Sequence, residues 1–128
     1  MIDASALAEV LLRTPTGDAL ARRVATEHLV APGLIDVEVA SVLRRYWLTG
    51  VLDDSEVAEV LGALVRWPIE RVPEQDVVGL SRRWWPNATA YDALYLAVAA
   101  AYGVGVLTCD GPLGRAPSSG VPIENFRV

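Results

Sequence analysis

The chain has 128 residues, of which 52% are hydrophobic, so it is long enough for one domain with its own core and too short to require a second. Its formal net charge of −5 argues against broad non-specific binding to nucleic acid, which needs a basic face, but leaves a local basic patch open. All eleven basic residues are arginines. The lack of lysine excludes Walker-type phosphate loops, Schiff-base chemistry and receiver-type phosphoacceptor sites.

Three features of the sequence predict a cytoplasmic protein without a membrane span. The only cysteine, Cys109, cannot form an internal disulfide and is expected to be a small core residue. Asp3 is an acid where an export signal carries basic residues. The apolar run that ends at Cys109 contains Gly103 and Gly105, which indicate a buried helix followed by a buried strand. The single His28 is expected to be structural, and no zinc site is expected.

Helical and strand patterns alternate along the chain. In the first half of the chain we expect the end of a strand at residues 1–3, a helix to about Arg13, a second helix carrying Leu20 and Val24, a strand at 29–31 and a helix at 34–48. The second half begins with a helix that starts near Asp53 and stops at Pro68, followed by a strand at 69–72 and helices at 75–85 and 89–102. A strand at 104–108 and a loop-rich tail with a last strand near 122–124 complete the prediction. Short apolar strands between helices predict an α/β fold, with a mostly parallel sheet covered by helices on both faces in one domain over residues 1–128.

Four acidic residues fall where such a fold places ligand sites. Asp3 and Asp110 each follow a predicted strand, and sites in parallel sheets lie beyond the carboxyl ends of the strands. Glu38 lies on the inward, apolar stripe of its predicted helix, and Asp92 is the only charged residue between Ala88 and Cys109. A buried ionised carboxylate needs a cation, a proton or a shared metal ion. The four acids therefore predict a metal site.

The strand-end acids each have a structural alternative. Taken alone, Asp3 is explained at least as well by a structural role, as the N-cap of the helix that follows it, as by metal binding. Asp110 precedes Gly111 and Pro112, so it is also typical of an ordinary turn.

The helical acids have alternatives as well. Glu38 could pair with Arg45, two turns further along the helix. Asp92 could be an early-helix acid stabilised by the helix dipole after a cap at Asn87 or Thr89. The neighbouring Asp36 is offset by two positions from Glu38 and is expected to point elsewhere.

Carboxylate oxygens are the ligands that Mg²⁺ and Mn²⁺ prefer, and such ions commonly keep several waters and contact substrate phosphates. An ion held in this way can activate a water for attack on phosphorus and offset charge on the leaving oxygen. Hydrolysis of phosphodiester bonds fits this chemistry.

Four segments in order resemble the PIN-domain family, and within it the VapC-type toxin ribonucleases of bacterial toxin-antitoxin pairs. The segments are Ile2-Asp3-Ala4-Ser5-Ala6-Leu7, residues 31–43 with Glu38-Val39-Ala40-Ser41-Val42-Leu43, Thr89-Ala90-Tyr91-Asp92-Ala93-Leu94-Tyr95-Leu96-Ala97, and Leu107-Thr108-Cys109-Asp110. The resemblance implies a PIN-like three-layer α/β/α sandwich and a Mg²⁺- or Mn²⁺-dependent endoribonuclease whose acidic site is Asp3, Glu38, Asp92 and Asp110, with Ser5 and Thr108 as supporting hydroxyls. It also implies a homodimer and a VapB-type antitoxin that blocks the site.

Two clusters combine arginines with aromatic residues, at positions 44–47 and 82–85. Arginines can pair with phosphates and aromatic rings can stack on bases, so either cluster suits RNA or an antitoxin helix. Equally, the tryptophans could belong to the core or a dimer interface and the arginines to solvated faces. A competing function is a catalytically degenerate PIN-like module that dimerises and binds a partner; a receiver-like domain is disfavoured by the missing lysine.

Overall fold

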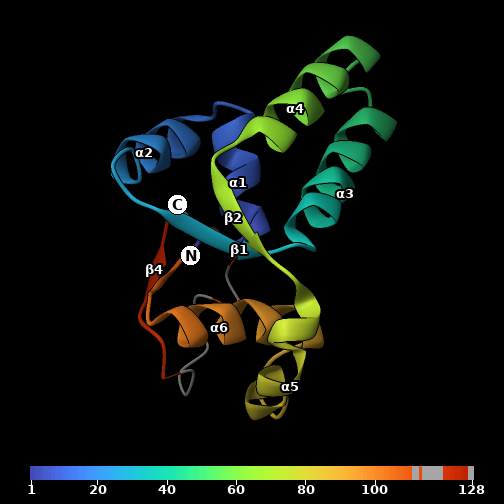
Figure 1. The fold of residues 1–128 in the computed structure, drawn as a ribbon. Coiled ribbons are helices and arrows are strands. Elements are labelled where there is room, and N and C mark those ends of the chain that lie inside the picture. The colour runs from blue at the N-terminus through green and yellow to red at the C-terminus, as the bar shows by residue number, and fades with distance from the viewer. Residues whose placement is uncertain (111–112, 114–119, 127–128) are drawn as a thin grey trace.

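A computed structural model describes residues 1–110, 113 and 120–126 of the chain, and Figure 1 shows its fold. The strands are β1 (Leu29–Pro32), β2 (Ile69–Val72), β3 (Val106–Thr108) and β4 (Ile123–Asn125). The helices are α1 (Ala4–Leu11), α2 (Pro15–Arg23), α3 (Ile35–Leu48), α4 (Asp54–Arg66), α5 (Val78–Ser81) and α6 (Ala90–Tyr102), with two short 3-10 helices, η1 (Glu74–Asp76) and η2 (Arg82–Trp84). The alternation confirms the α/β class.

The N-terminal segment joins two parallel strand pairs, β1 with β2 and β3 with β4. Ile2 forms a parallel bridge with Leu107, and its backbone nitrogen donates to the carbonyl of Val30 at 3.3 Å. The backbone nitrogen of Leu107 in turn donates to the carbonyl of Met1 at 2.8 Å. The segment therefore lies between β1 and β3, and Asp3, at its end, lies in the middle of the strand layer.

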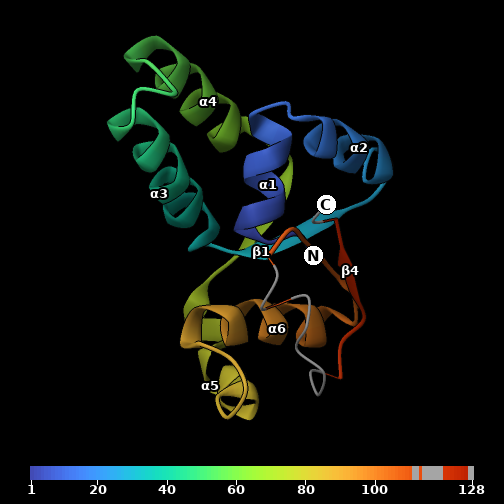
Figure 2. The same ribbon diagram turned by 180° about the vertical axis from the view of Figure 1, so that it is seen from behind.

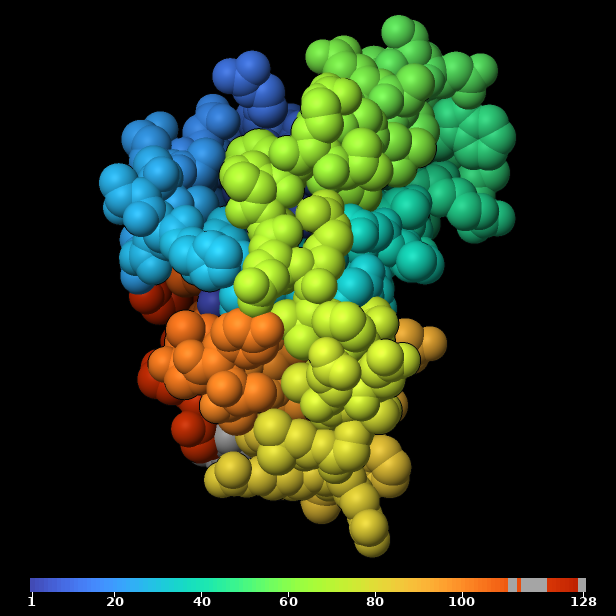
Figure 3. Space-filling view, viewed as in Figure 1, coloured from blue at the N-terminus to red at the C-terminus, as the bar shows by residue number. Residues whose placement is uncertain are grey.

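Helices cover both faces of the strands. Figures 1 and 2 show α1, α2, α3 and α4 on one side of β1, and α5 and α6 on the other. The apolar side chains between these layers are fully buried, among them Ile2, Leu7, Leu20, Ile35, Leu43, Leu96 and Val98. The far ends of α3 and α4 project from the body of the molecule, as the green part of Figure 3 shows. None of the described helices is long and apolar enough to cross a bilayer.

Two helix predictions need correction. The helix expected over 75–85 is split into η1, α5 and η2: Val77 leaves the helical region at a φ of −129°, and Gly79 is a weak helix former. The first helix ends at Leu11 rather than near Arg13, because Arg13 adopts a left-handed φ of 58°. At the start of α2, a Cβ on Gly17 would lie 1.8 Å from the carbonyl oxygen of Glu9, so only glycine lets α1 and α2 pack this closely.

The other elements lie within two residues of their expected bounds, although the two last strands are shifted. β3 begins at Val106 rather than residue 104, after a left-handed turn at Gly103 with a φ of 64°. β4 covers Ile123–Asn125 rather than 122–124. The loop-rich tail expected at 111–112 and 114–119 lies outside the described residues.

Candidate active site

Asp3 is buried at the start of α1 and is the N-cap of that helix. Its Oδ1 accepts hydrogen bonds from the backbone nitrogen of Ala6 at 2.9 Å and from the Ser5 hydroxyl at 2.7 Å. Its Oδ2 accepts a hydrogen bond from the hydroxyl of Thr108, at the end of β3. The capping interpretation is therefore correct, and it does not compete with a functional one, because the same carboxylate also faces a pocket.

Ser5 and Thr108 tie the two strand-end segments together. The Thr108 hydroxyl, which donates to Asp3, accepts a hydrogen bond from the backbone nitrogen of Asp110 at 2.8 Å. The Ser5 oxygen accepts one from the backbone nitrogen of Cys109 at 2.9 Å. Asp110 makes the expected turn contact, since its Oδ2 accepts from the nitrogen of Leu113 at 2.7 Å. Each hydroxyl thus fixes one acidic segment relative to the other.

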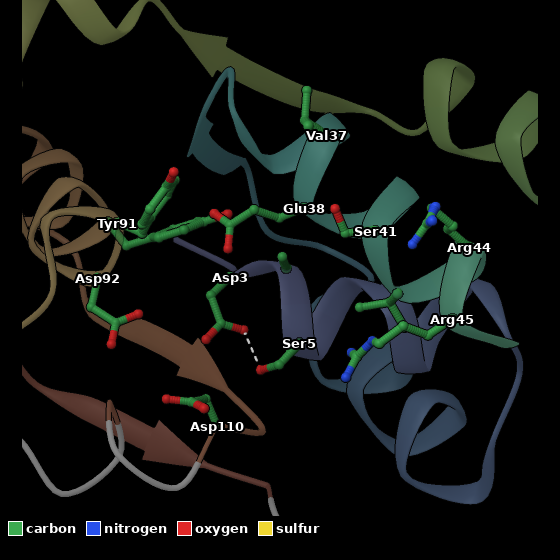
Figure 4. A pocket seen from close by; sticks show the side chains of 13 residues that line it. Asp3, Ser5, Val37, Glu38, Ser41, Arg44, Arg45, Tyr91, Asp92 and Asp110 are labelled. Atoms are coloured by element: carbon green, nitrogen blue, oxygen red, sulfur yellow. Dashed lines mark hydrogen bonds between the residues drawn. The ribbon is translucent and has the colours of Figure 1, made fainter. Parts of the chain in front are cut away.

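Glu38 and Asp92 approach from the two helical layers. Glu38 belongs to the first turn of α3, and Asp92 to the first turn of α6. The Thr89 hydroxyl caps α6 and accepts a hydrogen bond from the backbone nitrogen of Asp92 at 3.1 Å, as expected for an early-helix acid. Figure 4 shows that both carboxylates point toward Asp3 and Asp110. The four predicted acids come from four separate parts of the chain.

All four acids line one pocket of about 650 Å³. Figure 4 shows the carboxylates of Asp3, Glu38, Asp92 and Asp110 gathered at one end, and the side chains of Arg44 and Arg45 at the other. The remaining lining residues are Ala4, Ser5, Val37, Ser41, Val42, Tyr91 and Tyr95. The pocket therefore has an acidic end and a basic end.

Burial and mutual repulsion disfavour the ionised forms of these carboxylates. The pKa of Asp3 is raised to about 6: burial is the main cause, the charge of Asp110 adds to it, and the hydrogen bonds from Thr108, Ala6 and Ser5 act in the opposite direction. Burial also raises the pKa of Glu38, with added repulsion from Asp92 and Asp3. The pKa of Asp92 is raised by burial and then by the charge of Asp110. A bound cation would relieve all three effects.

The donor set fits a hard divalent cation. It consists of carboxylate oxygens, and none of the four acids forms an ion pair with a described residue. Oε1 of Glu38 is buried without a hydrogen-bond partner in the described part of the chain, so it has an unused acceptor. Among the same residues, no three acidic, histidine or cysteine side chains already stand close enough to hold an ion together. Side-chain movement would therefore have to accompany binding.

The structure also decides the alternative for Glu38 and the expectation for Asp36. Glu38 makes no ion pair with Arg45 in the described residues. Asp36 points away from the pocket, as expected, and its carboxylate pairs with Arg71 at 2.9 Å. His28 is exposed, 3.9 Å from Glu70, and lines a different cavity from the acids.

Tyr95 is a pocket residue that the sequence interpretation missed. It lies one turn after Asp92 on α6, is only 2% exposed, and its hydroxyl has no hydrogen bond of normal geometry with a described residue. Interaction with this hydroxyl nevertheless lowers the pKa of Glu38, against the larger effect of burial. The spacing of three residues from Asp92 was the available signal, but Tyr95 also fits an apolar buried stripe.

The two arginine and aromatic clusters have different surroundings. Arg44 and Arg45 line the acidic pocket, whereas Trp84 of the second cluster is buried in the core. The guanidinium of Arg83 lies 5.2 Å from the centre of the Trp84 ring. The core interpretation is correct for Trp84, and only the first cluster adjoins the acids.

Comparison with known proteins identifies the class to which this fold and pocket belong. The sequence profile of the PIN domain matches residues 1–117, so the chain belongs to the PIN domain family. VapC proteins are among its relatives. Ribonuclease VapC12 of Mycobacterium tuberculosis is 33% identical over 124 residues, covering 97% of this chain and 96% of the relative. Ribonuclease VapC9 of the same organism is 37% identical over 127 residues (96% and 94%), and Ribonuclease VapC1 is 32% identical over 126 residues (97% and 93%).

Proposed function

We propose that this chain, as a member of the VapC group, is the endoribonuclease toxin of a toxin-antitoxin pair and cleaves RNA with Mg²⁺ or Mn²⁺. The observation that carries the proposal is the convergence of Asp3, Glu38, Asp92 and Asp110 on one pocket, without a partner cation among the described residues. The relatives are named ribonucleases, which supports the same activity. We assign it to a single PIN-like domain over residues 1–128.

The four carboxylates would hold the ion, and when bound it would lower the pKa of a water and offset negative charge around phosphorus. Ser5 and Thr108 orient Asp3 by their hydrogen bonds, so that the carboxylate faces the pocket without a large rotation. Burial keeps Asp3 and its neighbours poorly hydrated, which strengthens their attraction for a cation.

The expected products are a 5′-phosphate and a 3′-hydroxyl, because attack of water on phosphorus expels the 3′ oxygen. Attack by the RNA's own 2′-hydroxyl needs a general base and acid, often two histidines, and leaves a cyclic phosphate. The only histidine, His28, lines another cavity.

The test is cleavage of a labelled RNA by the purified chain with Mg²⁺, with Mn²⁺ and with EDTA. We expect cleavage with either ion and none with EDTA. An RNA with a 2′-deoxy substitution at the mapped cleavage site should still be cut. Complete loss of cleavage there, with 2′,3′-cyclic ends on unmodified RNA, would refute attack by water.

The proposed partner is a VapB-type antitoxin that places a basic side chain in the acidic end and an apolar helix on the nearby surface. Val37 at the pocket and Trp47 and Leu48 further along α3 are exposed apolar side chains that such a helix could cover. Full ribonuclease activity of the purified pair would contradict this arrangement. We further propose a homodimer acting in the cytoplasm, which light scattering and cell fractionation can test.

The second candidate is a catalytically degenerate PIN-like module that dimerises and binds a partner. It would give no RNA turnover with any divalent metal, so the same assay separates the two functions.

A further inference from the structure

The basic end of the pocket is built by the same helix that supplies Glu38. Ser41 and Arg45 follow Glu38 at helical spacings of three and seven residues, so the three side chains share one face of α3. Arg44 lies beside this face, and its side chain also lines the pocket. One wall of the pocket therefore changes from acidic to basic along a single helix.

Arg44 and Arg45 are exposed, and neither forms an ion pair with a described residue. By contrast, Arg23 and Arg71 are both engaged by carboxylates. Seven residues separate Glu38 from Arg45, which corresponds to about 10 Å along the helix axis. The arginines therefore do not neutralise the acids.

A polyanion that enters this pocket meets a protein of net charge −5 and four converging carboxylates. Even with a divalent ion bound, the acidic end offers little attraction for the rest of an RNA strand. The two guanidinium groups at the basic end can supply this attraction for the RNA strand, since arginine binds phosphate through paired hydrogen bonds.

We propose that Arg44 and Arg45 form a subsite for a phosphate of the RNA strand next to the phosphate that is cleaved. The inference rests on the proposed function, because it places the cleaved phosphate at the acids. The subsite fixes the position of the strand in the pocket and takes no part in bond breaking.

The test compares Arg44→Gln, Arg45→Gln and the double variant with Arg22→Gln. Arg22 is an exposed arginine of α2 that does not line the pocket, so it controls for the loss of one positive charge. With Mn²⁺ and a single-stranded RNA of mixed sequence, the double variant should raise KM about tenfold or more and change kcat less than about twofold. The melting temperature should match that of the control.

Salt dependence gives a readout that a structural role would not change. Each phosphate contact to a single strand contributes about 0.7 to the slope of log affinity against log salt. The slope should therefore fall by about 0.7 in the double variant, which loses the whole phosphate contact, by less in each single variant, and stay unchanged for Arg22→Gln. Unchanged KM and slope in the double variant would overturn the subsite, even if inhibition by the antitoxin were lost, because the arginines would then belong to a protein interface.

Binding of the same RNA, labelled with fluorescein, in EDTA over a series of salt concentrations separates the subsite from the proposed function. One outcome is that the chain cleaves no RNA with any metal and still binds RNA with a salt dependence that is smaller in the variants. In that case the proposed function fails and the phosphate subsite stands. If the unaltered chain neither cleaves nor binds this RNA, both fail.

Discussion

The Thr108 hydroxyl, buried at the end of β3, donates a hydrogen bond to Asp3, 105 positions earlier in the chain. Thr108→Val keeps the shape of the side chain and removes this donor, so it should lower the free energy of unfolding by ~1–3 kcal/mol. It should also reduce cleavage about tenfold, because Asp3 loses part of its orientation. Urea unfolding and RNA cleavage are the measurements, and Thr26→Val, at an exposed position, is the control. Equal effects of both changes would contradict the prediction.

Asp92→Asn should separate catalysis from stability. Asp92 has no ion pair with a described residue, and burial and the charge of Asp110 both raise its pKa, so the neutral side chain is easier to bury. We expect a metal-free melting temperature equal to or above that of the unaltered chain. Cleavage should fall at least about 100-fold, because even the partners of metal ligands contribute 10- to 100-fold.

The control for this change is Asp18→Asn, at an exposed acid of α2, which should leave cleavage unchanged. A large loss of metal-free stability in Asp92→Asn would instead identify the carboxylate as a structural partner.

The metal-free protein should become more stable as the pH falls from above 6 toward 4. The pKa of Asp3 is raised to about 6 in the folded chain from an ordinary value of 3.8, so the folded state binds a proton before the unfolded state does. The gain from Asp3 alone is ~3 kcal/mol at most, and the raised pKa values of Glu38 and Asp92 act in the same direction.

Chemical denaturation over this pH range, with EDTA present, checks the sign. Asp3→Asn should flatten the profile. Saturating Mn²⁺ should do the same near neutral pH, because bound cations favour the ionised carboxylates. A profile that falls with decreasing pH in this window would contradict the assignment.

Tyr95→Phe should weaken metal binding without weakening the fold. The hydroxyl favours the ionised form of Glu38, so its removal should raise the pKa of Glu38 further and lower its affinity for Mn²⁺. The metal-free protein should be as stable as the unaltered chain or more stable, because a buried polar group without a normal hydrogen bond in the described structure is removed.

Calorimetric titration with Mn²⁺ at several pH values measures the effect of Tyr95→Phe, which should be largest below neutral pH. Tyr102→Phe is a matched control, since Tyr102 interacts with the carboxylate of Glu70 outside the pocket. Equal Mn²⁺ affinity in both variants would show that the Tyr95 hydroxyl does not act on Glu38.

Local rules in the sequence predicted most elements and the gathering of the acids. Asp3 and Asp110 follow short apolar strand segments, and the inward stripe of α3 placed Glu38, so periodicity alone brought these residues to one edge. Local rules failed over 75–85, where weak helix formers left the backbone to tertiary packing. They also could not separate Arg44 from Arg83, because the two clusters look alike in sequence. Only the fold shows that Trp84 is buried where η2 contacts α5 and α6, whereas Arg44 lines the pocket.

The reactivity of Cys109, the only thiol of the chain, can report on local opening of the sheet next to Asp3. Cys109 is partly buried, its backbone nitrogen binds Ser5, and burial raises its pKa to about 11. At pH 8 about one thiol in a thousand is then ionised, so a disulfide reagent reacts slowly with the closed protein. If the thiol is labelled faster than this small ionised fraction allows, the excess rate measures how often the sheet opens next to Asp3, and no probe has to be introduced.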